Sequence, residues 1–268
     1  MQWLDRQSFL GADSATRIGG VRVGQIGLGG GGSGISQHLA FHGFRNIVMA
    51  DPDRVEETNR NRLVGLTRMD VWLKRRKTAI ARRTVRRINP SARVECHAVP
   101  WQEAVDAFRS CDVILSAVDS FRARHEIETF CRRYFIPLID IGMTVTESPA
   151  GYQVSGQVFL STPGEPCLHC VNILNEKRLR QEADRYGAAG PAAQTAWANG
   201  VLAASAVGML IEQISPWSNE RTPTRLLEYD GNHHALRPSA KLKVLEGRTC
   251  PHHPLIEAGD PAFDRRKL

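Results

Sequence analysis

The sequence lacks any apolar run that approaches the roughly 18 residues of a membrane span. Its first residues, MQWLDR, show no basic region followed by an apolar core, so we expect no secretory signal and a cytoplasmic location. Internal repeats and low-complexity linkers are also missing. With 268 residues, of which 42% are hydrophobic and 24% charged, the chain can form one ordinary globular core, and wholesale disorder is not expected.

Acidic residues are too few to balance the basic ones, and the formal net charge is +7. Much of the excess lies in Lys74, Arg75, Arg76, Lys77, Arg82, Arg83, Arg86 and Arg87. A solvated helix face explains most of these residues, and an anion site for phosphates or an acidic protein partner is the sharper alternative. Because neither zinc-finger spacing on a helix nor a stacking-aromatic signature is present, nucleic acid is a weaker expectation.

Strand-like and helix-like segments alternate in the first half of the chain. Buried-type strands are predicted at 21–26, 46–50, 94–98, 113–117 and 138–141, and helices at 33–42, 78–88 and 121–134. This alternation predicts an α/β fold with a Rossmann-like, mostly parallel sheet and helices on both faces.

The second half is less regular. It contains predicted strands at 156–160 and 225–229, a polar crossing segment at 172–191, a buried helix at 197–214 and a polar tail after Pro254.

A glycine run joins the first strand to the first helix. Residues 27 to 32 match G-x-G-x-x-G, with Gly27, Gly29 and Gly32 at the fixed positions and Gly30 between them. Glycines at these places allow a tight turn and a close approach of phosphate to the helix N-terminus. Asp51 ends the second strand, where a ribose-binding acid is expected. Alone, this fingerprint favours a nicotinamide or flavin enzyme.

The residues that follow the second strand point elsewhere. Residues 51 to 62, DPDRVEETNRNR, resemble the D-x-D-x-V-x-x-S-N-x-x-R stretch of the ubiquitin-activating-enzyme superfamily, which includes the ThiF and MoeB adenylyltransferases. Four further matches are Lys77 with Arg87-Ile88-Asn89-Pro90, Asp112 to Ser120 with Arg124, Arg6-Gln7, and Gly164 to Cys170. The resemblance spans roughly residues 6 to 253.

The resemblance implies ATP- and magnesium-dependent adenylation of the C-terminal carboxylate of a ubiquitin-like or sulfur-carrier protein. Residues 1–150 would form the ATP-binding half, and 151–268 the half with the zinc ligands and the carrier-binding surface, within one adenylation domain. The implied roles are ribose binding by Asp51, nucleotide binding by Asp53, triphosphate binding by Asn59, Arg62 and Lys77, magnesium coordination by Asp119, and contact with the partner protomer's nucleotide by Arg6 and Gln7 of a homodimer.

Three departures from the family pattern affect this assignment. The glycine run extends past the usual length to Ser33 and its neighbours, and Ser120 replaces the usual Asn after Asp119. Two extra residues lie between Arg62 and Lys77, so Lys74 competes for the role of phosphate lysine. Arg62 and Lys77 could also be ordinary surface side chains. Asp119 could instead cap the helix that begins near Phe121.

Two short-spaced pairs suit a closed zinc site that joins distant segments of the chain. Cys167 and Cys170 form C-x-x-C, and Cys250 with His253 forms C-x-x-H, with His252 as the rival fourth ligand. Four protein ligands leave no position for water, which predicts a structural role.

No cysteine lies between Cys170 and Cys250, the interval where thioester-forming members of the resembled family keep their reactive thiol. We therefore expect adenylation without an obligatory enzyme thioester. A peptide or a tRNA-borne carboxylate stays open as the acceptor. A hydride-transferring dehydrogenase and a non-catalytic nucleotide-binding module are the alternatives from other classes, but a dehydrogenase leaves Arg62, Lys77 and Asp119 without a role.

Overall fold

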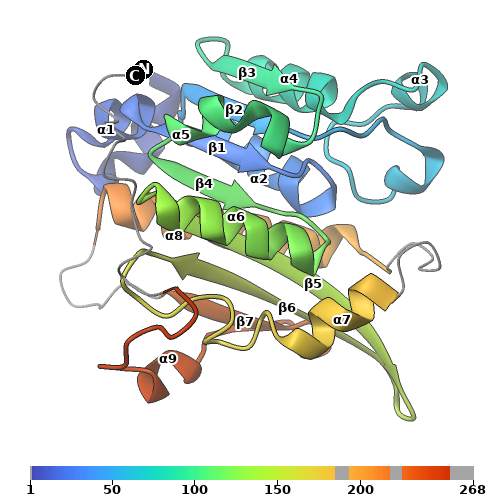
Figure 1. Ribbon diagram of the computed structural model, residues 1–268. Coiled ribbons are helices and arrows are strands. Elements are labelled where there is room, and N and C mark those ends of the chain that lie inside the picture. Colours follow the sequence, from blue (N-terminus) through green and yellow to red (C-terminus); the bar gives the residue numbers. More distant parts are fainter. Residues whose placement is uncertain (1, 185–192, 218–224, 254–268) are drawn as a thin grey trace.

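One eight-stranded sheet runs through the molecule, in the order β3-β2-β1-β4-β5-β6-β7-β8 (Figure 1). The computed structural model describes residues 2–184, 193–217 and 225–253. Five strands pair in parallel: β1 (Arg22–Ile26), β2 (Asn46–Ala50), β3 (Arg93–His97), β4 (Val113–Ser116) and β5 (Leu138–Ser148). Because β2 and β4 flank β1, the turns that follow these three strands meet at one edge of the sheet, where ligands bind in folds of this kind.

The other side of the sheet is antiparallel. It consists of β6 (Gly151–Ser161), β7 (Leu226–Asp230) and β8 (Ala235–Pro238). β5 and β6 form a hairpin that pairs Leu138 with Ser161 at one end and Ser148 with Gly151 at the other. Both strands have 11 residues and are longer than predicted, because their outer ends are solvent-exposed and carry no buried-strand pattern.

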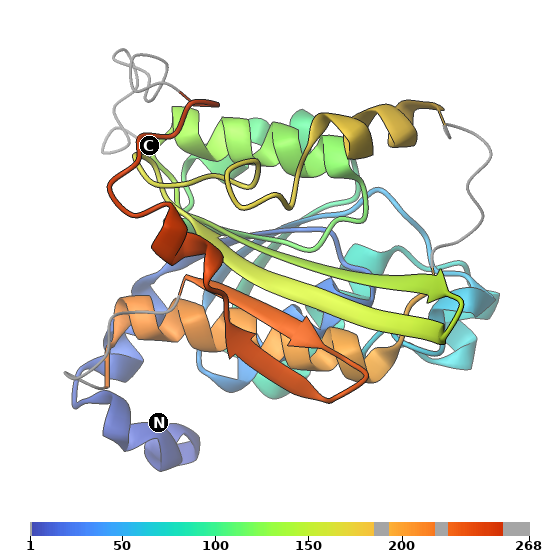
Figure 2. The ribbon, with the colours of Figure 1, turned by 90° about the horizontal axis from the view of Figure 1, so that it is seen from below.

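Helices cover both faces of the sheet (Figure 2). α2 (Gly30–Phe41), α4 (Lys77–Ile88) and α8 (Ala196–Ile214) cover one face, and α5 (Val105–Arg109) and α6 (Phe121–Arg133) cover the other, with α7 (Glu176–Asp184) alongside α6. The short elements are η1 (Gln2–Leu10), α1 (Ser14–Gly20), η2 (Glu57–Asn59), α3 (Arg68–Trp72), η3 (Trp101–Ala104) and α9 (Lys241–Val244). This arrangement confirms the α/β class and the parallel-dominant sheet.

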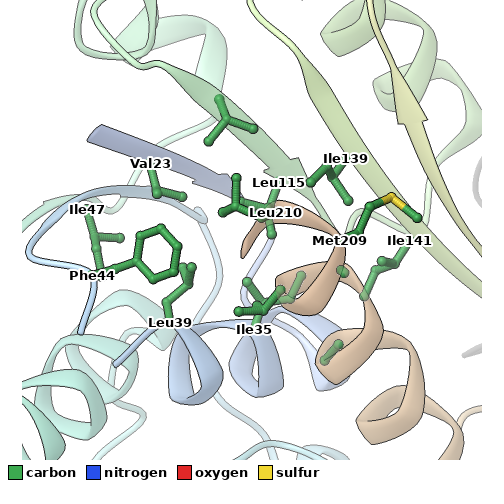
Figure 3. Close-up of a cluster of buried hydrophobic side chains, with 14 of the residues drawn as sticks. Val23, Ile35, Leu39, Phe44, Ile47, Leu115, Ile139, Ile141, Met209 and Leu210 are labelled. Carbon is green, nitrogen blue, oxygen red and sulfur yellow. The ribbon is translucent and has the colours of Figure 1, made fainter. Parts of the chain in front are cut away.

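The core beneath α2 and α8 holds the glycine-rich helix in place (Figure 3). Ile35 and Leu39 of α2 share one buried cluster with Met209 and Leu210 of α8 and with strand residues such as Leu115. Full burial of one such side chain contributes about 1.5–3 kcal/mol to folding. The two helices approach so closely that a Cβ on Gly34 would lie 2.9 Å from the Ala203 side chain. Packing of α2 against α8 therefore fixes the N-terminus of α2 relative to the sheet.

The predicted long helices are confirmed, with shifted ends. The first begins at Gly30 rather than Ser33, inside the glycine run, and the crossing segment contains α7. Residues 185–191 of that segment and the tail after Pro254 lie outside the described residues. None of the helices in the described ranges is both long and apolar enough to cross a membrane.

Candidate functional site

At two positions of the glycine turn after β1, a side chain would collide with backbone atoms. Gly27 has a φ of +86°, and a Cβ there would lie 2.7 Å from the Ala117 carbonyl oxygen at the end of β4. A Cβ on Gly32 would overlap the carbonyl oxygen of Gly27. Gly27 therefore permits the turn, and Gly32 lets α2 begin directly against it.

Gly29 differs from these two glycines because it faces open space. It is the N-cap residue of α2, and a Cβ placed on it would meet no atom within 4 Å. The first N–H groups of a helix have no partner within the helix, and the helix dipole favours an anion in front of them. The turn is thus shaped to receive a phosphate on the side of Gly29.

Asp51 lies beside this turn, at the end of β2. Its Oδ2 accepts a hydrogen bond from the Leu28 N–H at 2.7 Å, and its Oδ1 accepts one from the Asp53 N–H at 2.9 Å. Burial raises the pKa of Asp51, although Lys77, with its Nζ 4.0 Å from Oδ1, acts in the opposite direction. The carboxylate therefore lies where the first two strand ends meet, in the position predicted for the ribose acid.

A cleft of about 730 Å³ opens next to Asp51 between the β2–α4 connection and the start of α4. Asp53, Asn59, Lys74 and Lys77 line it. Lys77 Nζ lies 2.7 Å from Asp53 Oδ2, and only 13% of its side chain is exposed. Lys74 is exposed and lies between α3 and α4, with a φ of +46°. Of the two competing lysines, only Lys77 reaches the aspartates that follow β2.

Asp119 and Arg62 meet through a residue that the sequence did not single out. Gln194 accepts a hydrogen bond from Arg62 Nε at 3.0 Å and donates one from Nε2 to Asp119 Oδ1 at 3.0 Å. Arg62 Nη1 also donates to the Thr58 carbonyl oxygen at 2.6 Å and to Asn61 Oδ1 at 2.8 Å. Arg62 packs against α2, since its Cγ would lie 3.1 Å from a Cβ on Gly30.

A small cavity of about 20 Å³ lies between the glycine turn and β5. This is room for about one water molecule. Asp119, Arg124, Gln194 and Asn199 supply its polar lining. Arg124 is buried and forms an ion pair with Asp140, whose pKa burial raises to about 6. The cavity is thus lined both by Asp119, the predicted magnesium ligand, and by the buried Arg124.

Arg6 and Gln7 lie away from this edge. Gln7 Nε2 donates to the His42 carbonyl oxygen at 3.3 Å, just past the C-terminal end of α2. Because α2 has 12 residues and its N-terminus carries the glycine turn, this contact is about 18 Å from the turn. The chain therefore does not bring Arg6 and Gln7 to its own glycine turn.

Three cysteines and one histidine gather on the opposite part of the molecule. The Sγ atoms of Cys167 and Cys170 are 3.6 Å apart, as are those of Cys170 and Cys250. His252 Nδ1 lies 3.5 Å from the Sγ atoms of both Cys167 and Cys170. A tetrahedral zinc ion with metal–sulfur bonds of about 2.3 Å separates its ligand atoms by roughly 3.5–3.8 Å, so the donor set and its spacing fit zinc.

The fourth member of this cluster differs from the expectation. His252, and not His253, has a ring nitrogen within 4.8 Å of all three thiols. His253 has a ring nitrogen within 4.8 Å of the Cys167 thiol alone, and its Nε2 lies 3.6 Å from Oε2 of the fully buried Glu128. Glu128 also accepts hydrogen bonds from the Leu168 N–H at 3.0 Å and the Ser161 hydroxyl at 2.6 Å. His253 therefore contacts Glu128, the residue that holds the loop carrying Cys167.

Gln194, Asn199 and Glu182 are site residues that sequence reasoning missed. A Cβ on Gly30 would lie 2.7 Å from Asn199 Nδ2, so Asn199 borders the glycine turn. The signal for it was present, because Asn199 is a buried polar residue inside the apolar helix α8. Glu182 accepts hydrogen bonds from the N–H groups of Phe121 and Arg122 at the start of α6. Gln194 and Glu182 carry no local signal.

Two relatives of known name match part of this chain in sequence. The chain is 31% identical over 168 residues to the SAMP-activating enzyme E1 of Haloferax volcanii, covering 60% of this chain and 57% of that protein. It is 28% identical over 165 residues to adenylyltransferase and sulfurtransferase MOCS3 of Drosophila willistoni, covering 60% of this chain and 34% of that protein. The chain thus spans little more than half of the first relative and a third of the second.

Solved structures share the fold. E. coli MccB, crystallised with selenomethionine-labelled MccA, superposes with a TM-score of 0.71 at 21% identity, covering 88% of this chain and 70% of that one. The sequence model of the ThiF family matches residues 4–251, nearly the whole chain. With its glycine turn, its strand-end acids and its sheet order, this protein therefore belongs to the ThiF family.

Proposed function

We propose that this chain binds ATP with magnesium and adenylates the C-terminal carboxylate of a small ubiquitin-like or sulfur-carrier protein. The observation that carries the proposal is the convergence of Arg62, Lys77 and Asp119 on the sheet edge that holds the glycine turn. These are the charges that a magnesium triphosphate requires.

In the proposed complex, the phosphates lie in front of Gly29 at the N-terminus of α2. Asp51 holds the ribose, and Lys77, Arg62 and Asn59 bind the triphosphate. Asp53 is paired with Lys77 at 2.7 Å and would orient this lysine toward the nucleotide. A bound magnesium ion would neutralise phosphate charge, and the carboxylate of Asp119, which is exposed at the sheet edge, is the type of oxygen ligand it prefers.

The reaction needs no protein nucleophile. An oxygen of the carrier's carboxylate attacks the α-phosphorus of ATP, the bond to the bridging oxygen breaks, and pyrophosphate leaves with that electron pair. The chain's task is to hold two anions in line and to stabilise the charge that develops. Arg62 and Lys77 supply this positive charge.

A protein substrate is supported by a further relative, the ubiquitin-like modifier-activating enzyme 5 of Mus musculus, which is 30% identical over 188 residues. The names of the Haloferax and Drosophila relatives describe an activating enzyme and an adenylyltransferase with sulfurtransferase activity. A peptide substrate is the second candidate, because MccB, whose fold is similar, was crystallised with MccA. A dehydrogenase is disfavoured since Arg62 and Asp119, which Gln194 bridges, would have no function in hydride transfer.

The state of the cysteines supports adenylation without an obligatory thioester. Outside the cluster of Cys167, Cys170 and Cys250, burial raises the pKa of Cys111 to about 12 and that of Cys131 well above its usual value. Thiolate is the nucleophilic form, so these thiols are poor nucleophiles at neutral pH. We assign a structural zinc ion to the cluster, with His252 as its fourth ligand.

We further propose that the active form is a homodimer. Arg6 and Gln7 lie beyond the far end of their own α2, so a second copy is needed to bring them to a nucleotide. Their role in adenylation depends on this assembly.

Pyrophosphate exchange into ATP tests the proposal, with candidate carriers supplied as substrates. We expect exchange that requires magnesium and a carrier with a free C-terminus. Asp119→Ala should lower the exchange rate by about 10³-fold, the loss typical for removal of a charge-stabilising group. The control is Asp106→Ala, which removes an exposed carboxylate paired with Arg109. Full exchange by Asp119→Ala would remove this residue from the mechanism.

A further inference from the structure

Gln194 connects the two charged groups on which the proposed nucleotide site depends. Asp119 follows β4, Arg62 follows η2, and Gln194 precedes α8, so three distant parts of the chain meet at one amide. The sequence separations are 75 residues to Asp119 and 132 residues to Arg62. Both hydrogen bonds are 3.0 Å long, and both involve a charged partner.

Each charged group keeps one face for a ligand. Among the described residues, Asp119 Oδ2 and Arg62 Nη2 form no hydrogen bond, whereas Asp119 Oδ1 and Arg62 Nε are held by Gln194. Arg62 Nη1 is held by Thr58 and Asn61. The contacts thus orient both side chains and leave one carboxylate oxygen and one guanidinium nitrogen for incoming groups.

An amide is the side chain that this position requires. It must accept from a guanidinium and donate to a carboxylate, and an amide has an acceptor and a donor at its two ends. A carboxylate at position 194 could not donate to Asp119 and would repel it. Methionine is similar in size to glutamine, but its thioether can neither donate a hydrogen bond to Asp119 nor accept a strong one from Arg62.

Glu182 holds the same turn from its other side. Its two carboxylate oxygens accept from the N–H groups of Phe121 at 3.1 Å and Arg122 at 2.9 Å. Asp119 and Ser120 lie directly before these two residues, and the Ser120 hydroxyl caps Ala123. The turn that carries Asp119 is therefore fixed at its backbone by Glu182, while Gln194 fixes the carboxylate itself.

We propose that Gln194 is a positioning residue of the nucleotide site, which sets the carboxylate of Asp119 and the guanidinium of Arg62 for a magnesium–triphosphate ligand. This inference rests on the proposed function, because it assumes that the two charges receive this ligand. It adds a residue that belongs to neither of the two sequence motifs at the sheet edge but contacts one residue of each, Arg62 and Asp119.

The test is calorimetric titration of the full chain with ATP in the presence of magnesium. Gln194→Met should weaken binding by about 10–100-fold, the usual loss when a partner of a metal ligand is removed. It should also raise the magnesium concentration needed for half-maximal pyrophosphate exchange, while the affinity for adenosine, which has no phosphates, stays unchanged. If Gln194 had only a structural role, Gln194→Met would change the affinities for adenosine and for magnesium–ATP alike.

Gln102→Met is the matched control. It removes an amide that donates to Glu126 Oε2 at 2.8 Å on the surface of the protein, so it makes the same chemical change outside the site. Equal magnesium–ATP affinity of Gln194→Met and the wild type would overturn this inference alone. Failure of the wild type to bind magnesium–ATP would overturn the proposed function as well. If Gln194→Met unfolds, Gln194→Ala is to be measured, with thermal unfolding as the check that it is folded.

Discussion

The sheet edge that carries the glycine turn, Arg62 and Asp119, here called the nucleotide edge after its proposed function, differs from the cysteine–histidine cluster in how its polar groups are satisfied. At the edge, Asp119 and Arg62 are only partly engaged, and the glycine turn leaves open space before α2. In the cluster, four donor atoms of Cys167, Cys170, Cys250 and His252 face one another within 4.8 Å. A site with free charges is arranged to exchange ligands, whereas a closed tetrahedron is arranged to keep one.

The residues behind each site show the same contrast. Glu128 and Arg132 are both buried behind the cluster, where they hold the loop of residues 165–168 through the Leu168 N–H and the carbonyl oxygens of Glu165 and Pro166. At the nucleotide edge, Gln194 holds each charged group by one hydrogen bond, accepting from Arg62 and donating to Asp119. Loss of the cluster should therefore affect folding first, and loss of groups at the edge should affect binding first.

Cys250→Ser is the change with the largest expected effect on stability. Zinc binding contributes directly to folding, and removal of one thiolate should lower the free energy of unfolding by roughly 4 kcal/mol or more. Chemical denaturation with metal analysis measures both effects. Cys96→Ser is the control, since Cys96 is half-buried outside the cluster and its thiol contacts the Thr78 carbonyl oxygen. Unchanged stability with full loss of zinc would contradict the structural role.

Two alanine substitutions separate folding from binding within the glycine turn. Gly32→Ala forces a Cβ onto the Gly27 carbonyl oxygen and should cost about 2 kcal/mol of stability. Gly29→Ala meets no atom within 4 Å, so its effect on unfolding should stay below about 1 kcal/mol. We expect Gly29→Ala to weaken ATP binding at least tenfold because its methyl group enters the space for phosphate. ATP binding at wild-type strength by Gly29→Ala would show that the phosphates lie elsewhere.

Asp70 is a carboxylate whose oxygens are bound by the protein itself, and it serves as a comparison for Asp119. It is buried, and Arg83 donates to both of its oxygens, at 2.7 and 2.6 Å. Hydrogen bonds from Arg83 hold the pKa of Asp70 well below its usual value. Asp70 thus differs from Asp119, since its acceptors are occupied by the protein.

The sign of the pH effect follows from this depressed pKa. The Asp70 carboxylate contributes stability that is fully present above the unfolded pKa near 4 and is lost as the pH falls through the folded value. Asp70→Asn should lower the unfolding free energy by about 1–2 kcal/mol at pH 7, and this difference should shrink below about pH 4. Urea denaturation at several pH values measures it. A difference that does not depend on pH would rule out the charge as its cause.

Much of the fold and part of the candidate site could be predicted because their signals are local. One short stretch of chain contains the strand before Gly27, the spaced glycines and the acid that follows β2. Each of these features can be recognised from neighbouring residues alone. The length of β5 and β6 could not be predicted, because their exposed ends pair through the hairpin without an apolar pattern. The start of α2 inside the glycine run also depends on tertiary packing, since glycine alone disfavours a helix.

The residues that were missed act over long sequence distances. Gln194 reaches Asp119 across 75 residues, and no periodicity or motif marks such a contact. The choice between His252 and His253 depends on the direction of the chain after Pro251, where one ring turns to the thiols and its neighbour turns to Glu128. Spacing rules identify candidate ligands of this kind but do not choose between adjacent ones.

The most direct measurement is calorimetric titration of the wild-type protein with magnesium–ATP and, separately, with reduced nicotinamide dinucleotide. We expect saturable binding of magnesium–ATP that Asp119→Ala weakens strongly, and no binding of the dinucleotide. Binding of the dinucleotide at the glycine turn, with no heat from magnesium–ATP, would contradict the proposed function.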